Sequence, residues 1–112
     1  MRDLRLQVHP EVEETDLVEI TSHVAQDNSV AAANVYAAIT SMFVELARQP
    51  MLGTEIHPLR RTLKGIRMFV VGDYPNYLIY YRPLPEVTGV RILYVLHAAR
   101  DAATFAKEYR RK

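Results

Sequence analysis

Three residues in the second half of the chain have side chains suited to chemistry. Arg67 lies within an apolar run, and His97 and Arg100 follow another such run. A histidine can act as a general base, and guanidinium groups stabilise anionic oxygens. However, no serine, carboxylate or second histidine stands at triad-like spacing, because the other histidines are scattered as His9, His23 and His57. We therefore expect His97 to be structural, its ring donating to a backbone carbonyl, with a catalytic base as the alternative.

The two arginines each allow two interpretations. Arg67 could pair with Asp73 or Asp101 and so organise a sheet, or it could contact an anionic segment of a partner. Arg100 could form a local ion pair with its neighbour Asp101 at the end of a strand. Both interpretations stay open for Arg67 at this point.

Further basic and aromatic side chains could contribute to a binding surface. Arg60 and Arg61 lie in a basic loop, and a second basic group, Arg110-Arg111-Lys112, follows later; a solvated face is the simpler interpretation of both. Strand alternation places Tyr77 and Tyr81 on one side of a sheet and Tyr80 on the other. Tyrosine is favoured at protein interfaces, although sheet packing would also account for it.

Charge is distributed unevenly, although the net charge is only +1. Residues 1–49 contain three basic and eight acidic residues, a balance of −5, whereas residues 50–112 contain eleven and five, a balance of +6. This asymmetry indicates either an anionic partner for the second half or two halves that complement each other within the fold. The chain has no cysteine and no metal-binding motif, so we expect no metal and no cofactor.

The elements that position these residues follow from hydrophobic periodicity. Alternation at residues 4–8 predicts a strand, and Pro10 begins a helix. Asn28 or Ser29 is expected to cap a second helix, which Pro50 and Gly53 end. The apolar stripe of this helix is predicted to be Ala32, Tyr36, Ile39, Phe43 and Leu46.

Three strand-like runs, residues 66–71, 77–82 and 90–96, are separated by short turns and predict an antiparallel meander. Residues 102–111 could form a short closing helix. The expected fold is α+β: an N-terminal strand, an antiparallel helical hairpin over residues 10–49, and a three-stranded meander. A length of 112 residues predicts one domain spanning 1–112, and the polar start and short apolar runs predict a cytoplasmic protein with no membrane segment.

The ordered motifs Gly65-Ile66-Arg67-x-Phe69, Tyr77-x-Ile79-x-Tyr81-Arg82 and Ile92-Leu93-x-Val95-Leu96-His97-x-x-Arg100-Asp101 resemble the RelE/ParE toxin superfamily, and its ParE (plasmid stabilisation) branch in particular. The helix ending Leu46-x-x-x-Pro50-x-x-Gly53 is similar to the family pattern as well. The resemblance implies a toxin of a type II toxin–antitoxin system, held inactive by a ParD-like antitoxin, expected to be a ribbon-helix-helix protein. DNA would then be met only through the antitoxin.

Two activities occur in this superfamily. The ParE branch is associated with poisoning of DNA gyrase, and the RelE branch cuts mRNA on the ribosome. Where a RelE-type enzyme resembling this chain has a catalytic arginine, this chain has Leu78; its lysine pair is reduced to Arg67 with Phe69 beside it. Its last tyrosine is replaced by Ala106, with Tyr109 one turn away, and Arg100 is kept.

A centre with so few cations would stabilise phosphate poorly. We therefore interpret the chain as a gyrase-inhibiting toxin rather than an enzyme. A RelE-type ribonuclease is the alternative, and a degenerate toxin that only binds its antitoxin is a third possibility. The residues expected to contact antitoxin or target are Arg60, Arg61, Arg67, Tyr81, His97 and Arg100.

Overall fold

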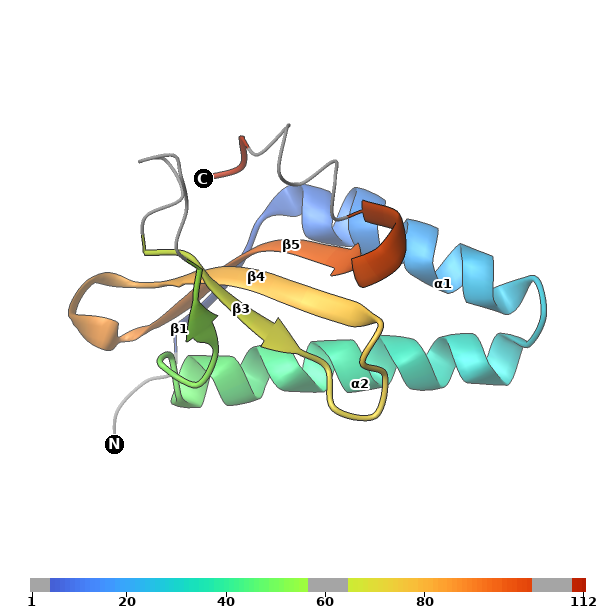
Figure 1. Cartoon of the computed structure of the whole chain (residues 1–112), viewed down its shortest axis with the longest axis horizontal. Helices are drawn as coiled ribbons and strands as arrows, with labels where there is room; N and C mark the ends of the chain where they lie inside the picture. Colours follow the sequence, from blue (N-terminus) through green and yellow to red (C-terminus); the bar gives the residue numbers. More distant parts are fainter. Residues whose placement is uncertain (1–4, 57–64, 102–109) are drawn as a thin grey trace.

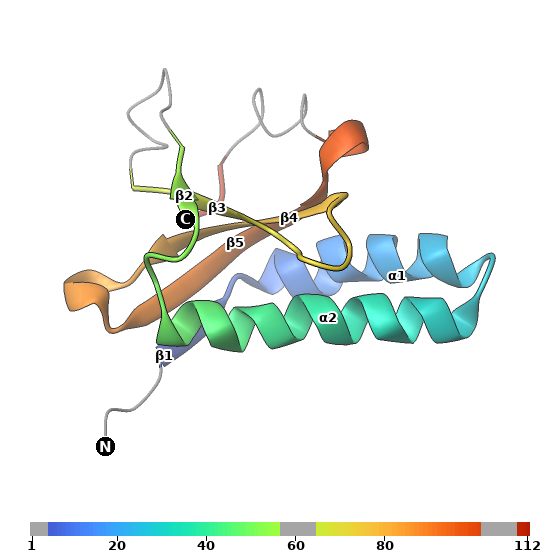
Figure 2. The ribbon, with the colours of Figure 1, turned by 60° about the horizontal axis from the view of Figure 1, so that its bottom comes forward.

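Two antiparallel helices cover one face of a five-stranded sheet (Figures 1 and 2). The computed structural model describes residues 5–56, 65–101 and 110–112. The elements run in the order β1 (Arg5–Val8), the π-helical η1 (Val12–Asp16), α1 (Leu17–Ala25), α2 (Ser29–Arg48), β2 (Thr54–Glu55), β3 (Arg67–Val70), β4 (Tyr77–Pro83), the short η3 (Pro85–Val87) and β5 (Gly89–His97). The predicted α+β fold is confirmed.

The predicted meander forms the centre of this sheet, whose strand order is β1-β5-β4-β3-β2. β3, β4 and β5 pair antiparallel, as expected. β1 joins parallel to β5, with Val8 opposite Ile92, and the two-residue β2 is added beyond β3. The sequence pattern did not predict these two pairings, because one joins distant segments and the other is too short to show alternation.

The helical hairpin is built as predicted at its turn. Asn28 is the N-cap of α2, and its side-chain oxygen accepts a 3.0 Å hydrogen bond from the backbone N–H of Ala31. By length and composition α2 could span a membrane, a property that core helices of globular proteins share. The helical residues 98–101 follow β5. Residues 102–109 of the predicted closing helix lie outside the described residues, and its last two residues, Arg110 and Arg111, are not helical.

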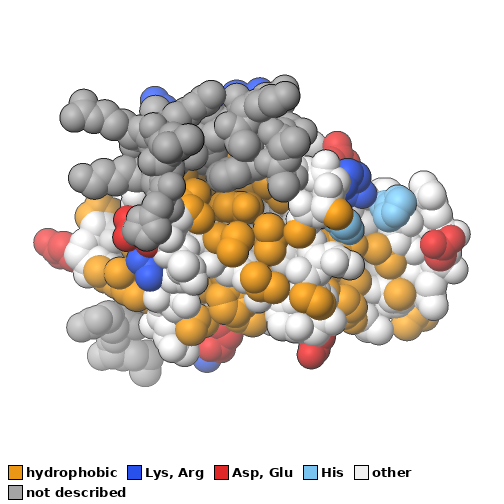
Figure 3. All heavy atoms as spheres, viewed as in Figure 1, with side chains coloured by type: hydrophobic (Ala, Val, Ile, Leu, Met, Phe, Trp, Pro, Cys, Tyr) orange, Lys and Arg blue, Asp and Glu red, His pale blue; other side chains and the backbone are white. Residues whose placement is uncertain are grey.

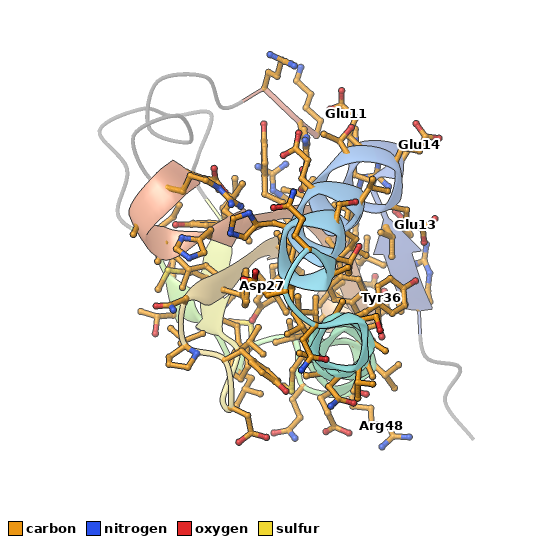
Figure 4. The ribbon with its side chains drawn as sticks, turned by 90° about the vertical axis from the view of Figure 1, so that its right-hand side faces the viewer. Glu11, Glu13, Glu14, Asp27, Tyr36 and Arg48 are labelled. Carbon is orange, nitrogen blue, oxygen red and sulfur yellow. The ribbon has the colours of Figure 1, made fainter. Side chains whose placement is uncertain are left out.

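The face of α2 that meets the sheet differs by one position from the prediction. Val35, Ile39, Phe43 and Leu46 are buried, whereas Tyr36 is 47% exposed, so its predicted burial is wrong. The positions recur at intervals of four, four and three residues, which centres the buried stripe on Val35. Figure 4 shows Tyr36 on the outside of α2.

A β-bulge changes the alternation along β5. Tyr80 lies opposite Tyr94 and Tyr81 opposite Ile92, so Leu93 is an extra residue in β5. As a result Leu93 and Tyr94 both pack on the face away from the helices, in a second apolar cluster with Ile66 and Tyr80. Ile79, Tyr81, Ile92 and Val95 pack under the helices. Both faces of the sheet centre are therefore apolar.

Replacing Phe43 with alanine tests the position of the α2 stripe. Because Phe43 is 4% exposed, F43A should lower the free energy of unfolding by about 3–5 kcal/mol. Y36A is the matched control and should change it by only about 0.5 kcal/mol. Urea unfolding followed by circular dichroism measures both. Equal losses from the two variants would contradict this packing.

Candidate functional site

Arg67 and Tyr81 face each other on β3 and β4 and together hold the loop that follows α2. The Tyr81 hydroxyl donates to the Pro50 carbonyl and accepts from the Gly53 N–H, both at 2.8 Å. Arg67 Nε donates to the Gly53 carbonyl at 2.8 Å, and Nη2 donates to Met51 at 3.1 Å. The guanidinium thus binds backbone carbonyls, and of its two interpretations the ion pair with Asp73 or Asp101 is wrong.

This loop anchor explains the glycine after the helix. A Cβ on Gly53 would lie 2.7 Å from the Tyr81 hydroxyl and 2.8 Å from the Met68 carbonyl oxygen, closer than real Cβ contacts allow. Burial raises the pKa of Tyr81, and this shift is opposed by the hydrogen bond from Gly53 and the charge of Arg67. Tyr81 is fully buried. The Tyr81 side chain is therefore not accessible for the predicted contact with antitoxin or target, because its ring and hydroxyl are buried inside the fold.

His97 and Arg100 lie together at the end of β5, with Asp101 beside them. The backbone N–H of His97 donates to Asp101 Oδ2 at 2.8 Å, and the ring Nδ1 of His97 accepts from the backbone N–H of Arg100 at 3.2 Å. Its ring also meets the Tyr77 ring edge to face, with centroids 5.5 Å apart. His97 therefore has a structural role as expected, but its ring accepts from an amide instead of donating to a carbonyl.

Arg100 forms the expected local ion pair, with Nε 3.4 Å from Asp101 Oδ1. Its side chain is 43% exposed, so it remains accessible to a partner. Arg60 and Arg61 lie outside the described residues. The structure therefore divides the other four predicted residues between two places, the loop anchor (Arg67, Tyr81) and the β5 end (His97, Arg100).

The most extensive polar cluster surrounds Arg111, which the sequence analysis assigned to a solvated tail. Arg111 is 9% exposed and Asp16 6% exposed. Arg111 Nη1 and Nη2 donate to the two Asp16 oxygens at 2.5 and 2.9 Å. Arg111 Nε donates to Glu11 at 2.9 Å, and its guanidinium lies 4.0 Å from the centroid of the Tyr94 ring. We call this cluster the Arg111 clasp; Figure 4 shows Glu11 on the adjoining helical segment.

The clasp completes the edge of β5 where β1 ends. The last backbone hydrogen bond on the β1 side is donated by the backbone N–H of His9 to the Ile92 carbonyl, at 2.9 Å. The chain then turns at Pro10 toward η1. Beyond that point Asp16 accepts from the Val95 N–H at 2.9 Å, and Arg111 donates to the Leu93 carbonyl at 3.0 Å. An ion pair thus takes the place of a strand and satisfies buried backbone groups.

Electrostatics within the clasp favour the charged arginine. Burial opposes the charge of Arg111, but the hydrogen bonds and charge of Asp16 outweigh it and raise the pKa of the guanidinium. One half of the clasp had a sequence signal: Asp16 is an acid four residues from both Val12 and Ile20, which are buried. Arg111 had none, because its partners lie far away in the chain.

The described residues contain no group of three or more metal-ligating side chains. At the loop anchor, the β5 end and the clasp, polar side chains form hydrogen bonds to the backbone and to neighbouring side chains. Such an arrangement positions loops and ends of strands. It leaves Arg100 as an accessible cation at the end of β5 for binding.

Breaking the clasp should be costly, because it leaves a buried charge without a partner. We expect R111M or D16N alone to lower the free energy of unfolding by about 3–5 kcal/mol. The double variant D16L/R111M should lose less than the sum of the two single effects, since both charges are removed. Chemical denaturation measures all three, with R110M as the control that removes a neighbouring exposed arginine. Strictly additive losses would contradict a coupled pair.

The comparisons with known proteins bear on the whole arrangement. No match to the chain was found among curated proteins. The family model described as the ParE toxin of a type II toxin–antitoxin system, parDE, matches residues 6–102. This span includes the loop anchor, the β5 end and Asp16, but Arg111 lies beyond it. Because the match covers most of the sequence, the chain belongs to the ParE toxin family of type II toxin–antitoxin systems.

Proposed function

We propose that this toxin acts by protein–protein contact, inhibiting DNA gyrase, rather than by cutting RNA. The observation that carries the proposal is the apolar centre of the sheet face away from the helices. Leu78 packs there against the cluster of Ile66, Tyr80, Leu93 and Tyr94. A ribonuclease of the RelE type needs cations around the phosphate at this place. Arg67, the other candidate, is bound to the loop carbonyls.

The outer side of the hairpin offers apolar surface to a protein partner. From Ser29 to Val44, α2 carries no charged residue, and its exposed positions include Ala33, Ala37 and Val44 with Tyr36 beside them. Figure 3 shows a different side of the molecule, where hydrophobic side chains also spread across the face formed by α2, β3 and β4. A contiguous apolar surface of this kind is typical of an interaction site.

We assign this hairpin surface to the cognate antitoxin. A shallow groove between the helices is lined by Thr21, Ser22, Ala25, Ala32, Ala33 and Tyr36. All of these except Tyr36 are small, which allows an apolar helix to approach closely. An acidic antitoxin segment could continue from the hairpin to Arg100 at the β5 end. Neutralisation by a ParD-like protein would then combine apolar burial with a charge contact at the rim.

Two assays on the same purified protein distinguish a gyrase inhibitor from a nuclease. We expect inhibition of gyrase supercoiling with ribosome-bound mRNA left intact, because the sheet centre lacks the groups for cleavage. The variant F43A, which should be destabilised, controls for dependence on the fold. Prompt mRNA cleavage with unchanged supercoiling would favour the RelE-type alternative. No response in either assay, with antitoxin binding retained, would favour a degenerate toxin.

The antitoxin surface is tested by placing a charge on α2. Y36D should weaken binding of the antitoxin encoded by the neighbouring gene at least tenfold, about 1.4 kcal/mol, because a carboxylate would be buried in an apolar interface. The control V87D adds the same charge at an exposed position of η3, at the end of β5 away from Arg100, and should bind normally. R100E should reduce affinity as well. Calorimetric titration that gives equal affinities for Y36D and V87D would rule out this surface.

A further inference from the structure

One end of the sheet gathers arginines on the face away from the helices. Arg82 and Arg91 lie directly opposite each other on β4 and β5. Val90 and Ile92 pack under the helices, so Arg91 between them points to the other face. In β1, Gln7 pairs with Arg91 and Arg5 with Gly89, so Arg5 shares this face. Like charges opposite each other on neighbouring strands are destabilising by themselves.

The C-terminal residues add two cations to this end of the sheet. The Tyr94 hydroxyl accepts from the Arg110 N–H at 3.1 Å, and Arg91 Nε donates to the Lys112 carbonyl at 2.8 Å. Residues 110–112 therefore cross the far face between Tyr94 and Arg91, held by the Arg111 clasp. Figure 2 shows the C-terminus on the side of the sheet away from α1 and α2. We call Arg5, Arg82, Arg91, Arg110 and Lys112 the basic face.

Two acids near this face, Glu11 and Asp16, are already paired. Glu11 and Asp16 bind Arg111, and within the described part of the chain no carboxylate forms an ion pair with Arg5, Arg91 or Arg110. Burial lowers the pKa of His9, and the charges of Arg111 and Arg91 lower it further. The charge of Arg91 therefore acts on His9, just before η1. A protein with a net charge of only +1 has concentrated its cations here.

We propose that the basic face binds the phosphate backbone of duplex DNA. Contact with phosphates needs cations and little apolar surface, whereas a peptide partner needs apolar anchors. Tyr80 and Tyr94, the aromatic side chains of this face in the described part of the chain, are each 8% exposed, so they form no platform for stacking single-stranded bases. The sequence analysis expected DNA to be met only through the antitoxin, and the assembled basic face is the reason to revise that expectation.

The choice of DNA rests on the proposed function, because a gyrase inhibitor works beside DNA that the enzyme holds. A toxin that contacts both would bind the gyrase–DNA complex more tightly than either component. The two surfaces of the molecule would then have separate roles. The apolar hairpin would meet the antitoxin, and the basic face would meet phosphates while the antitoxin is absent.

The test measures binding of the full chain to a short labelled DNA duplex by fluorescence anisotropy between about 50 and 200 mM salt. We expect R5Q/R110Q to weaken binding for all sequences alike and to reduce the slope of log affinity against log salt by about 1 per arginine. The control R48Q/K112Q distinguishes the location of the charges from their number. It removes two positive charges, as R5Q/R110Q does, but only one of them belongs to the basic face. The slope of log affinity against log salt should therefore fall by half as much. R82K/R91K should keep the slope, because it keeps the charges.

Four outcomes would overturn the proposal. These are the absence of DNA binding at low salt, equal losses for R5Q/R110Q and the control, tighter binding to a single strand or an RNA hairpin, and displacement of DNA by polyglutamate at equal charge concentration. Supercoiling is measured in parallel on the same proteins. Salt-dependent DNA binding without gyrase inhibition would sustain this inference and contradict the proposed function. Gyrase inhibition by a protein that binds no DNA, with R5Q/R110Q inhibiting equally well, would contradict this inference and sustain the proposed function.

Discussion

The pairing of Asp16 with Arg111 at the edge of β5 is the interaction on which much of this structure depends. It joins the first helical segment, β5 and residues 110–112 at one point. The two side chains are almost fully buried, and together they satisfy the Val95 N–H and the Leu93 carbonyl that β1 leaves behind. In a low-dielectric interior such groups must be paired, and a half-satisfied cluster would be worse than none.

The loop anchor of Tyr81 and Arg67 makes the corresponding connection at the far end of α2. Its hydrogen bonds reach Pro50, Met51 and Gly53, so the exit of the hairpin is tied to the middle of the sheet. The clasp holds the entry of the hairpin through Asp16. Between the two lies the apolar layer of α2 on β4 and β5, which supplies stability but little directional information. The polar connections at both ends fix where the helices lie on the sheet.

Local patterns in the sequence were sufficient for the layers of this fold but not for its long-range polar connections. Alternation correctly separated Tyr77 and Tyr81 from Tyr80 on the two sides of the sheet, and Asn28 was one of the two residues expected to cap α2. The α2 stripe was misplaced at Tyr36, because aromatic character outweighed the smaller Val35 in the pattern. Arg67 was recognised as unusual within its strand, yet its partners are backbone carbonyls, which have no sequence signature. Arg111 was missed because Asp16 lies far away in the chain.

The bulge at Leu93 connects the fold to the difference between the two activities in this superfamily. On the Gly89 side of the bulge, the far face of β5 and β4 presents Arg91 and Arg82; on the His97 side it presents Tyr94, Tyr80 and Leu78. Cations therefore occur on this sheet, but at the end away from His97 and Arg100. A nuclease centre would need them together with those two residues around one phosphate. The sheet separates the groups along its length, which favours binding over cleavage.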